Sequence, residues 1–140
     1  MSSRILGPAG GDARPEFSQG IAVTGQQTLV FLAGQVAVDD SGQVVGDTVA
    51  EQAGQVFRNL GDLLAEASAT FEHVGSFTTY LTSDAGIPDF VAFRRDAFPG
   101  MFPGGRYPTN TLLVVSELAR PAFLIEVSAI AAMPAPAEAG

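Results

Sequence analysis

The sequence has no cysteine and no lysine, and it contains a single histidine, His73. The missing cysteines exclude disulfides, thiolate nucleophiles and Cys-ligated metals, and the missing lysines exclude Schiff-base chemistry on a lysine amine. One histidine cannot build a multi-histidine metal site. Because His73 follows Phe71-Glu72 where a helix is expected to end, we interpret it as a solvated residue of the last helical turn, not a catalytic one.

Charge is also scarce. Charged residues make up 16% of the chain and apolar residues 46%, against roughly 25% charged residues in an average globular protein. The net charge of −8 would repel a polyanion, so nucleic acid is not an expected partner. No apolar run approaches the ~18 to 20 residues of a membrane span, and no leader is visible at the N-terminus. These features predict a cytoplasmic protein without membrane contact.

The chain is expected to form one domain over residues 15–132, between an irregular head (1–14) and a disordered, Pro- and Ala-rich tail (133–140). Apolar segments at 20–24 and 28–33 flank Gly25 and predict a hairpin. Further strands are expected at residues 43–45, 74–82, 110–118 and 122–131, the last two joined by a turn at 119–121.

Two helices are predicted between these strands. Thr48 and Glu51 have the spacing of a capping box, and the apolar residues behind them recur at three- and four-residue steps through Ala67. Pro88 suits the first turn of a second helix, which we expect to run through Phe98 and to end at Pro99-Gly100.

This order of elements predicts a two-layer α+β domain with one mixed sheet of about six strands and both helices on one face. Segments 112–115 and 123–125 are apolar on both sides of their strands. We therefore expect the uncovered face of the sheet to pack against other subunits.

Glu126 is the most informative ionisable residue. Strand alternation places it on one face with Leu124, Ser128 and Ile130. A carboxylate on a largely apolar face is costly unless it is paired or its pKa is raised, and this is the environment of a general acid or base. The equally weighted alternative is an edge-strand glutamate that faces solvent and guards against aggregation.

Arg94 lies within the apolar arc of the second helix, whereas Arg95, Asp96 and Asp89 lie outside it. A guanidinium on a buried face must meet a carboxylate, a carbonyl or a ligand anion, since it stays charged at any ordinary pH. The alternative is a snorkelling arginine whose stem covers the core while its head reaches water.

The segment 104–111 has the composition of a loop and leads directly into a strand. The composition by itself favours an ordinary turn. Such a junction can also present backbone N–H groups and the side chains of Thr109, Asn110 and Thr111 to a ligand carboxylate. Gly34-Gln35, after an earlier strand, is a similar case.

Several short motifs, in this order, resemble the RidA/YjgF/L-PSP family over roughly residues 15 to 132. They are Phe17-Ser-Gln-Gly20, Leu32-Ala-Gly-Gln-Val36, Gln52-Ala53, Asn59-Leu60, Tyr80-Leu-Thr82, the segment 90–98, Tyr107-Pro108 and the segment 125–131. The resemblance implies a chorismate-mutase-like fold, a homotrimer and ligand clefts between subunits. It also implies hydrolysis of reactive 2-imino or enamine acids to 2-keto acids and ammonia without a cofactor.

By this resemblance Glu126 matches the pocket glutamate that helps to hold the attacking water, and Gly34 matches a glycine that lines the pocket. Phe17 stands where many members carry a tyrosine. Archetypal deaminases have a carboxylate-binding arginine at the position of Asn110, which contributes no charge. Arg94 is our candidate replacement for that cation.

Arg106 is a second candidate for the missing cation, and Thr111 and the backbone near Gly34 are expected to help bind the anionic end of the substrate. The predicted function is an imine or enamine deaminase acting in an inter-subunit cleft. Two alternatives are a pathway-specific tailoring or detoxifying enzyme with a remodelled pocket, and a non-catalytic metabolite-binding trimer. Ribonuclease activity, also known in the family, fits the charge of −8 least well.

Overall fold

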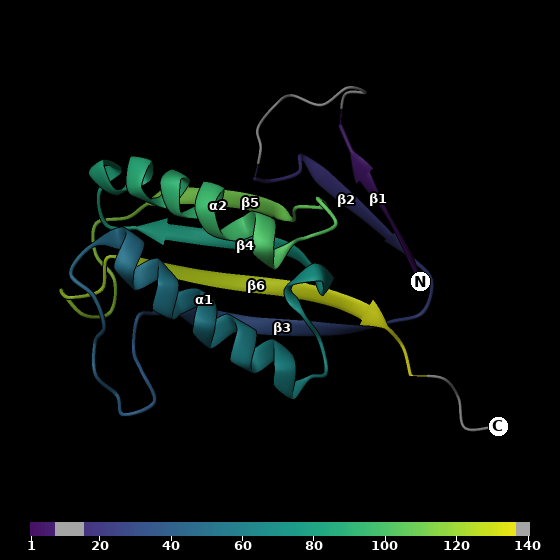
Figure 1. Ribbon diagram of the computed structural model, residues 1–140, viewed down its shortest axis with the longest axis horizontal. Coiled ribbons are helices and arrows are strands. Elements are labelled where there is room, and N and C mark those ends of the chain that lie inside the picture. The colour runs from purple at the N-terminus through teal and green to yellow at the C-terminus, as the bar shows by residue number, and fades with distance from the viewer. Residues whose placement is uncertain (8–15, 137–140) are drawn as a thin grey trace.

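The computed structural model describes residues 1–7 and 16–136. In chain order the elements are β1 (Ser2–Leu6), β2 (Gly20–Thr24), β3 (Gln27–Gln35), α1 (Val49–Glu66), the 3-10 helix η1 (Phe71–His73), β4 (Val74–Leu81), the 3-10 helix η2 (Asp84–Gly86), α2 (Ile87–Met101), β5 (Thr109–Val114) and β6 (Ile125–Pro134) (Figure 1).

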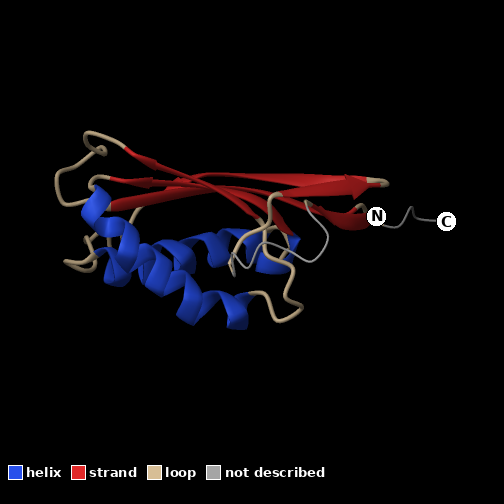
Figure 2. Ribbon diagram, turned by 90° about the horizontal axis from the view of Figure 1, so that it is seen from above, coloured by secondary structure: helices blue, strands red, loops and turns tan. Residues whose placement is uncertain are grey.

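Two helices lie on one face of a mixed sheet, as the sequence predicts (Figure 2). The strands β3, β6, β4 and β5 form a four-stranded sheet in that order, with β6 antiparallel to both neighbours and β4 parallel to β5. The remaining strands, β1 and β2, pair only with each other. The α+β class and the one-sided helix layer are thus confirmed, but the strands are divided between two sheets.

The hairpin expected from residues 20–24 and 28–33 is wrong in its pairing. Both segments are strands, but β2 pairs with β1 and β3 pairs with β6. Apolar alternation identifies a strand but does not show which strand it pairs with. The strand at Ser2–Leu6 was not predicted, and it pairs with β2 where β3 was expected to do so. The last two strands do not form a hairpin either, because β4 lies between β5 and β6.

The expected strand at residues 43–45 is only an isolated bridge between Val38 and Val44. Asp39 holds this segment in a turn, because its carboxylate accepts hydrogen bonds from the backbone N–H groups of Ser41 and Gln43 at 2.9 and 3.0 Å. A side chain that bonds its own following backbone favours a turn over a ladder.

The chain ends are more ordered than the composition indicates. The head expected over residues 1–14 contains β1, and the tail expected from residue 133 contributes Met133 and Pro134 to β6. Proline is tolerated there because it lies at the end of the ladder, opposite Gln27. Residues 8–15 and 137–140 lie outside the described residues.

Helix α1 begins as predicted: the Thr48 hydroxyl accepts from the Glu51 N–H at 3.2 Å. Helix α2 runs beyond the expected stop, through Pro99 to Met101. The proline there gives up one helical hydrogen bond, but the turn is kept because Phe98 and Phe102, on either side of it, are both 1% exposed in the core. No helix in the described ranges is long and apolar enough to cross a membrane.

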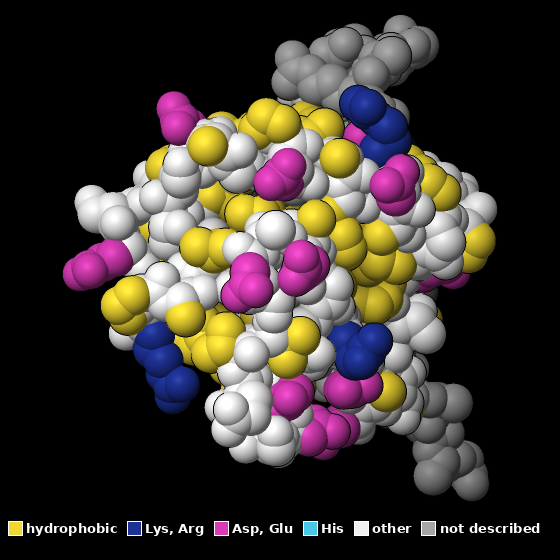
Figure 3. All heavy atoms as spheres, turned by 60° about the vertical axis from the view of Figure 1, so that its left-hand side comes forward, with side chains coloured by type: hydrophobic (Ala, Val, Ile, Leu, Met, Phe, Trp, Pro, Cys, Tyr) yellow, Lys and Arg dark blue, Asp and Glu magenta, His cyan; other side chains and the backbone are white. Residues whose placement is uncertain are grey.

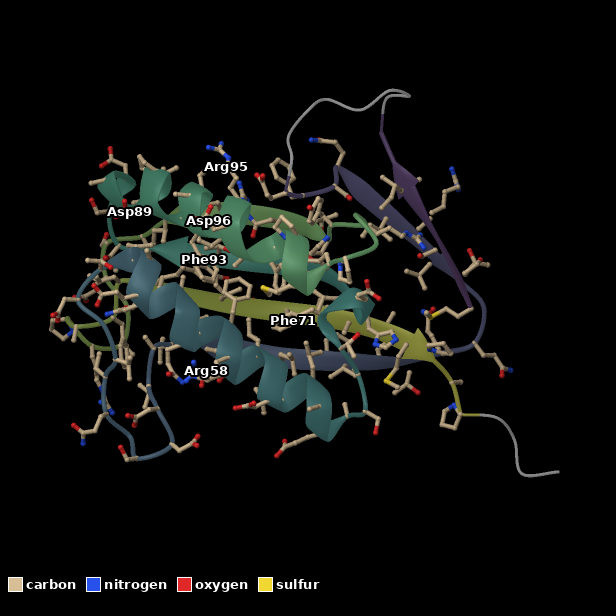
Figure 4. The ribbon with its side chains drawn as sticks, viewed as in Figure 1. Arg58, Phe71, Asp89, Phe93, Arg95 and Asp96 are labelled. Carbon is tan, nitrogen blue, oxygen red and sulfur yellow. The ribbon has the colours of Figure 1, made fainter. Side chains whose placement is uncertain are left out.

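The core lies between the helices and the sheet and is rich in phenylalanine. Phe57 of α1 contacts Phe93 and Phe98 of α2 and Phe77 of β4, with ring centroids 5.4 to 5.5 Å apart. In Figure 4 Phe93 points between the helices, whereas Arg95 points away from the sheet. This aromatic cluster holds α1 and α2 together on one side of the sheet.

The other side of the four-stranded sheet, the open face, carries no helix. Alternation along β6 buries Ile125, Val127 and Ala129 against the helices and leaves Glu126 and Ser128 on the open face. Several large apolar side chains of this face are exposed, namely Leu29, Phe31, Leu113 and Ile130. An apolar face of this extent is typical of a surface that contacts a partner, and the packing of this face against other subunits stays a prediction.

Candidate functional site

Glu126 is the charged residue at the centre of the open face. It lies on β6, which is flanked by β3 and β4, and its side chain is half-buried. The alternative of an edge-strand glutamate is therefore wrong. A carboxylate held on a central strand, among apolar and hydroxyl side chains, is the environment from which general-base chemistry was predicted.

Gly34 of β3 adjoins the Glu126 carboxylate. A Cβ at position 34 would lie 2.7 Å from both Cδ and Oε2 of Glu126, closer than real Cβ contacts allow. The carboxylate therefore lies over the Gly34 backbone in space that any other residue would fill. The structure brings together these two residues, which the sequence singled out independently.

Two amide side chains of α1 fix the segments on either side of this pair. The Gln52 side chain, 1% exposed, accepts from Leu124 N–H at 2.8 Å and donates to Ala122 O at 2.7 Å, just before β6. Asn59 Nδ2 donates to Val36 O and Val38 O at 3.1 and 2.9 Å, just after β3. The helix layer thus sets the positions of both strands at the point where Gly34 and Glu126 meet.

The neighbours of Glu126 on β4 and β5 are polar but uncharged. Tyr80 is directly opposite Glu126 across the β4–β6 ladder, and Thr78 is opposite Ser128. Thr111 of β5, a predicted binding residue, pairs with Thr78 and completes a row of three hydroxyl side chains. Sequence reasoning placed Ser128 beside Glu126 but missed Tyr80 and Thr78, because their proximity depends on a strand register that periodicity does not give.

Arg94 lies on the helix-covered side, with 7% of its surface exposed. Its guanidinium carbon lies 5.3 Å from the Phe17 ring centroid and 5.2 Å from that of Phe90. Burial lowers the pKa of Arg94, and the nearby Glu16 carboxylate, itself 4% exposed, acts in the opposite direction. The snorkelling alternative is wrong, since the guanidinium is enclosed between two rings and faces an acidic residue.

Within one chain Arg94 and Glu126 lie on opposite sides of the sheet. Phe17 lies on the same side of the sheet as Arg94, in contact with its guanidinium. The segment that carries Phe17 runs beside the start of β5, where Ser18 N–H donates to Pro108 O at 2.9 Å. The sheet separates these residues from the open face. A pocket that contains both Arg94 and Glu126 therefore requires a second copy of the chain.

The remaining predicted residues lie apart from Glu126. Asn110, where the archetypal arginine is expected, points to the helix-covered side and its Oδ1 accepts from the Thr79 hydroxyl at 2.8 Å. Arg106 donates to Ser3 O at 2.7 Å and ties the loop before β5 to β1. It borders a cavity of about 220 Å³ between β1, β2 and η1 that neither Gly34 nor Glu126 lines.

His73 also borders this cavity, and its Nδ1 accepts from the Thr70 N–H at 3.0 Å. It is a half-buried part of η1, so the expectation of a solvated residue in the last turn of α1 is corrected: α1 ends at Glu66 and η1 is a separate turn. Across residues 1–7 and 16–136, no three His, Asp or Glu side chains gather in a way that could hold a metal ion.

The family model and the related sequences that match this chain belong to one protein family. Residues 11–133 match the family model described as endoribonuclease L-PSP. A RutC family protein from Pyrococcus abyssi is 33% identical over 116 residues, covering 82% of this chain and 84% of the relative. A 2-iminobutanoate/2-iminopropanoate deaminase from Rattus norvegicus is also 33% identical over 116 residues, covering 82% of this chain and 78% of the relative.

Among solved structures, a protein of unknown function of the conserved Rid family from Yersinia pestis is similar to this chain, with a TM-score of 0.80 and 29% identity. The match covers 95% of this chain and 100% of that one. The family model, the relatives and the shared fold agree with the motif order read from the sequence. The chain belongs to the RidA/YjgF/L-PSP family.

Proposed function

We propose that this chain is a cofactor-independent hydrolase that converts a reactive imine or enamine to a carbonyl compound and ammonia at Glu126. The observation that carries the proposal is the packing of the Glu126 carboxylate over Gly34 on a central strand of the open face. Relatives that are imine deaminases, such as the rat protein, support the same kind of reaction.

In the proposed reaction Glu126 holds a water molecule and takes one of its protons as the water oxygen bonds to the imine carbon. The electron pair of the C=N bond moves to nitrogen, which receives that proton from Glu126. The carboxylate next takes the hydroxyl proton of the resulting carbinolamine and passes it to the amine nitrogen. The C=O bond then forms as the C–N bond breaks, and its electron pair leaves with nitrogen as ammonia. Imine and water thus give carbonyl and ammonia, and Glu126 returns to its starting state.

We further propose that the complete pocket forms between copies of the chain in a homotrimer. The exposed apolar residues of the open face, Phe31 and Ile130 among them, support such packing. A neighbouring copy is also the route by which the half-buried Phe17 reaches the open face of the first, whereas Arg94, 7% exposed, stays enclosed in its own chain. Within the same chain the sheet prevents that approach.

Exchange of Glu126 for glutamine tests the proposal, because it keeps the size of the side chain and removes the base. We expect E126Q to lose about 10²- to 10⁴-fold in kcat for the hydrolysis of an imine generated in the assay by an amino-acid or amine oxidase. The matched control is E66Q, which makes the same exchange at the end of α1, in the helix layer. Full activity of folded E126Q would contradict the proposal.

The pathway-specific alternative is favoured by one observation, the neutral Asn110 at the position of the archetypal arginine. It predicts negligible hydrolysis of 2-iminopropanoate together with Glu126-dependent turnover of another imine. A metabolite-binding trimer would instead bind ligands and release them unchanged. RNA cleavage that survives extensive purification and is lost in E126Q would favour a ribonuclease over both.

A further inference from the structure

Glu126 is the only charged residue on the four-stranded sheet. The segments Gln27–Gln35, Val74–Leu81, Thr109–Val114 and Ile125–Pro134 contain no arginine and no other acidic residue. The arginines of the described chain lie on other elements: Arg4 on β1, Arg58 on α1, Arg94 and Arg95 on α2, and Arg106 and Arg120 in loops. A ligand on the open face therefore meets one negative charge, and no strand of that sheet offers it a cation.

Three of the described arginines lie near groups outside the four-stranded sheet. Arg94 is enclosed with Glu16 on the other side of the sheet. Arg106 is bonded to Ser3, and the Arg120 guanidinium lies 5.4 Å from the Phe123 ring centroid. On the side of the molecule that Figure 3 shows, acidic side chains are scattered among hydrophobic ones with a few arginines between them, and the net charge of the chain is −8.

The polar side chains nearest to Glu126 along the strand ladders of its own chain carry hydroxyl groups. Tyr80 faces it directly across the ladder, and side chains at such opposed positions have Cβ atoms about 5 Å apart. The next row contributes Ser128, Thr78 and Thr111. Hydroxyl groups donate to carbonyl, imine or amide atoms without adding charge, so this platform suits a neutral polar ligand.

A carboxylate placed beside Glu126 would be held poorly. Two like charges a few ångströms apart repel, and the repulsion grows as the face is covered and water is excluded. A neutral imine meets no such cost, and its protonated iminium form is attracted to Glu126. Hydroxyl donors alone are weaker partners for a carboxylate than the bidentate arginine that archetypal members use.

We infer that the open face takes a ligand that has no carboxylate, an imine whose nitrogen faces Glu126 and whose polar substituent is bound by the Tyr80 hydroxyl. The inference rests on the proposed function and names the substrate class of the same site. Tyr80 is assigned as a specificity-determining residue, because it is the hydroxyl-bearing residue paired with Glu126 across the β4–β6 ladder.

A pair of stable probes tests this charge preference independently of turnover. Pyruvate and pyruvamide have the same carbon skeleton and differ in an anionic carboxylate against a neutral amide. In titrations of the full chain followed by NMR or calorimetry, we expect pyruvamide to bind about 10-fold more tightly than pyruvate. In E126Q the ratio should fall towards unity because the repelling charge is gone. Pyruvate that binds as tightly as pyruvamide, or pyruvamide that does not bind, would overturn the inference.

A charge-addition variant sharpens the test. Leu113 lies in the row of Tyr80, two strands or about 10 Å from Glu126, so L113R places a cation within reach of a bound carboxylate. We expect L113R to tighten pyruvate binding about 10-fold. The control L29R adds the same charge to the same face about 20 Å along the strands and should leave the affinity for pyruvate unchanged. Equal effects of the two variants would contradict a local preference.

Tyr80 is tested by Y80F, which removes one hydroxyl and keeps the ring. We expect about a 10-fold loss in pyruvamide affinity with little change for pyruvate, and no change in the oligomeric state. Equal losses for both probes would refute the assignment of Tyr80. The proposed function and the charge preference can fail separately. If E126Q abolishes imine hydrolysis but the parent protein binds pyruvate more tightly than pyruvamide, the proposed function stands and only the charge preference is refuted.

Discussion

The two sides of the four-stranded sheet differ in what surrounds their charged residue. On the helix-covered side the buried Arg94 is enclosed by Phe17, Phe90 and the acidic Glu16 of its own chain. On the open face Glu126 is surrounded by Gly34, Tyr80 and hydroxyl side chains, with no cation on any strand of that sheet. A charge that is balanced within the chain stabilises the fold, and one that is left for a ligand to meet is available for chemistry.

The largest effect on stability is expected at Arg94. Exchange for methionine keeps much of the stem but removes the cation on which Glu16, 4% exposed, acts, and should lower the free energy of unfolding by about 3 kcal/mol. The measurement is denaturant unfolding followed by circular dichroism. The neighbouring exchange R95M, at an exposed position of the same helix, should stay within about 0.5 kcal/mol of the parent. Similar losses in both variants would mean that Arg94 has no special structural role.

Gly34 gives the corresponding test on the open face, with activity as the readout. The methyl group of G34A would lie 2.7 Å from the Glu126 carboxylate and must displace it. A displacement of about 1 Å in a catalytic group costs roughly 100-fold in rate, so we expect that loss in imine hydrolysis with a folded protein. G54A is the matched control: its added methyl meets nothing within 4 Å on α1 and should preserve activity.

The contrast between the two sides was partly readable from the sequence. Helical periodicity placed Arg94 among buried residues, and strand alternation placed Glu126 on one face with Ser128 and Ile130, because both patterns depend only on local geometry. The pairing of Tyr80 with Glu126 was not readable, since register is set by packing between segments distant in the chain. The same limitation explains why β1 was missed and why β2 was paired with the wrong strand.

Pro99 and Glu16 show a second limit of prediction from local sequence patterns. Pro99 was expected to end α2, but burial of Phe98 and Phe102 outweighs the missing hydrogen bond. Glu16 carried no local signal, because its role depends on the approach of its segment to α2. A charged residue next to an aromatic one before a strand is too common a pattern to predict that a buried carboxylate lies near a buried arginine.

The smallest predicted effect compares one substitution on both sides of the sheet. F17L removes an aromatic face from Arg94, and the loss of one cation–π contact should cost about 1 kcal/mol in the free energy of unfolding. F31L makes the same exchange on the open face, where Phe31 is 69% exposed, and should change the unfolding of an isolated chain by less than about 0.5 kcal/mol. Both are measured at concentrations where the chain is monomeric. If the proposed trimer buries Phe31, the order reverses as concentration rises, because F31L then weakens the contact between copies while F17L still acts within one chain.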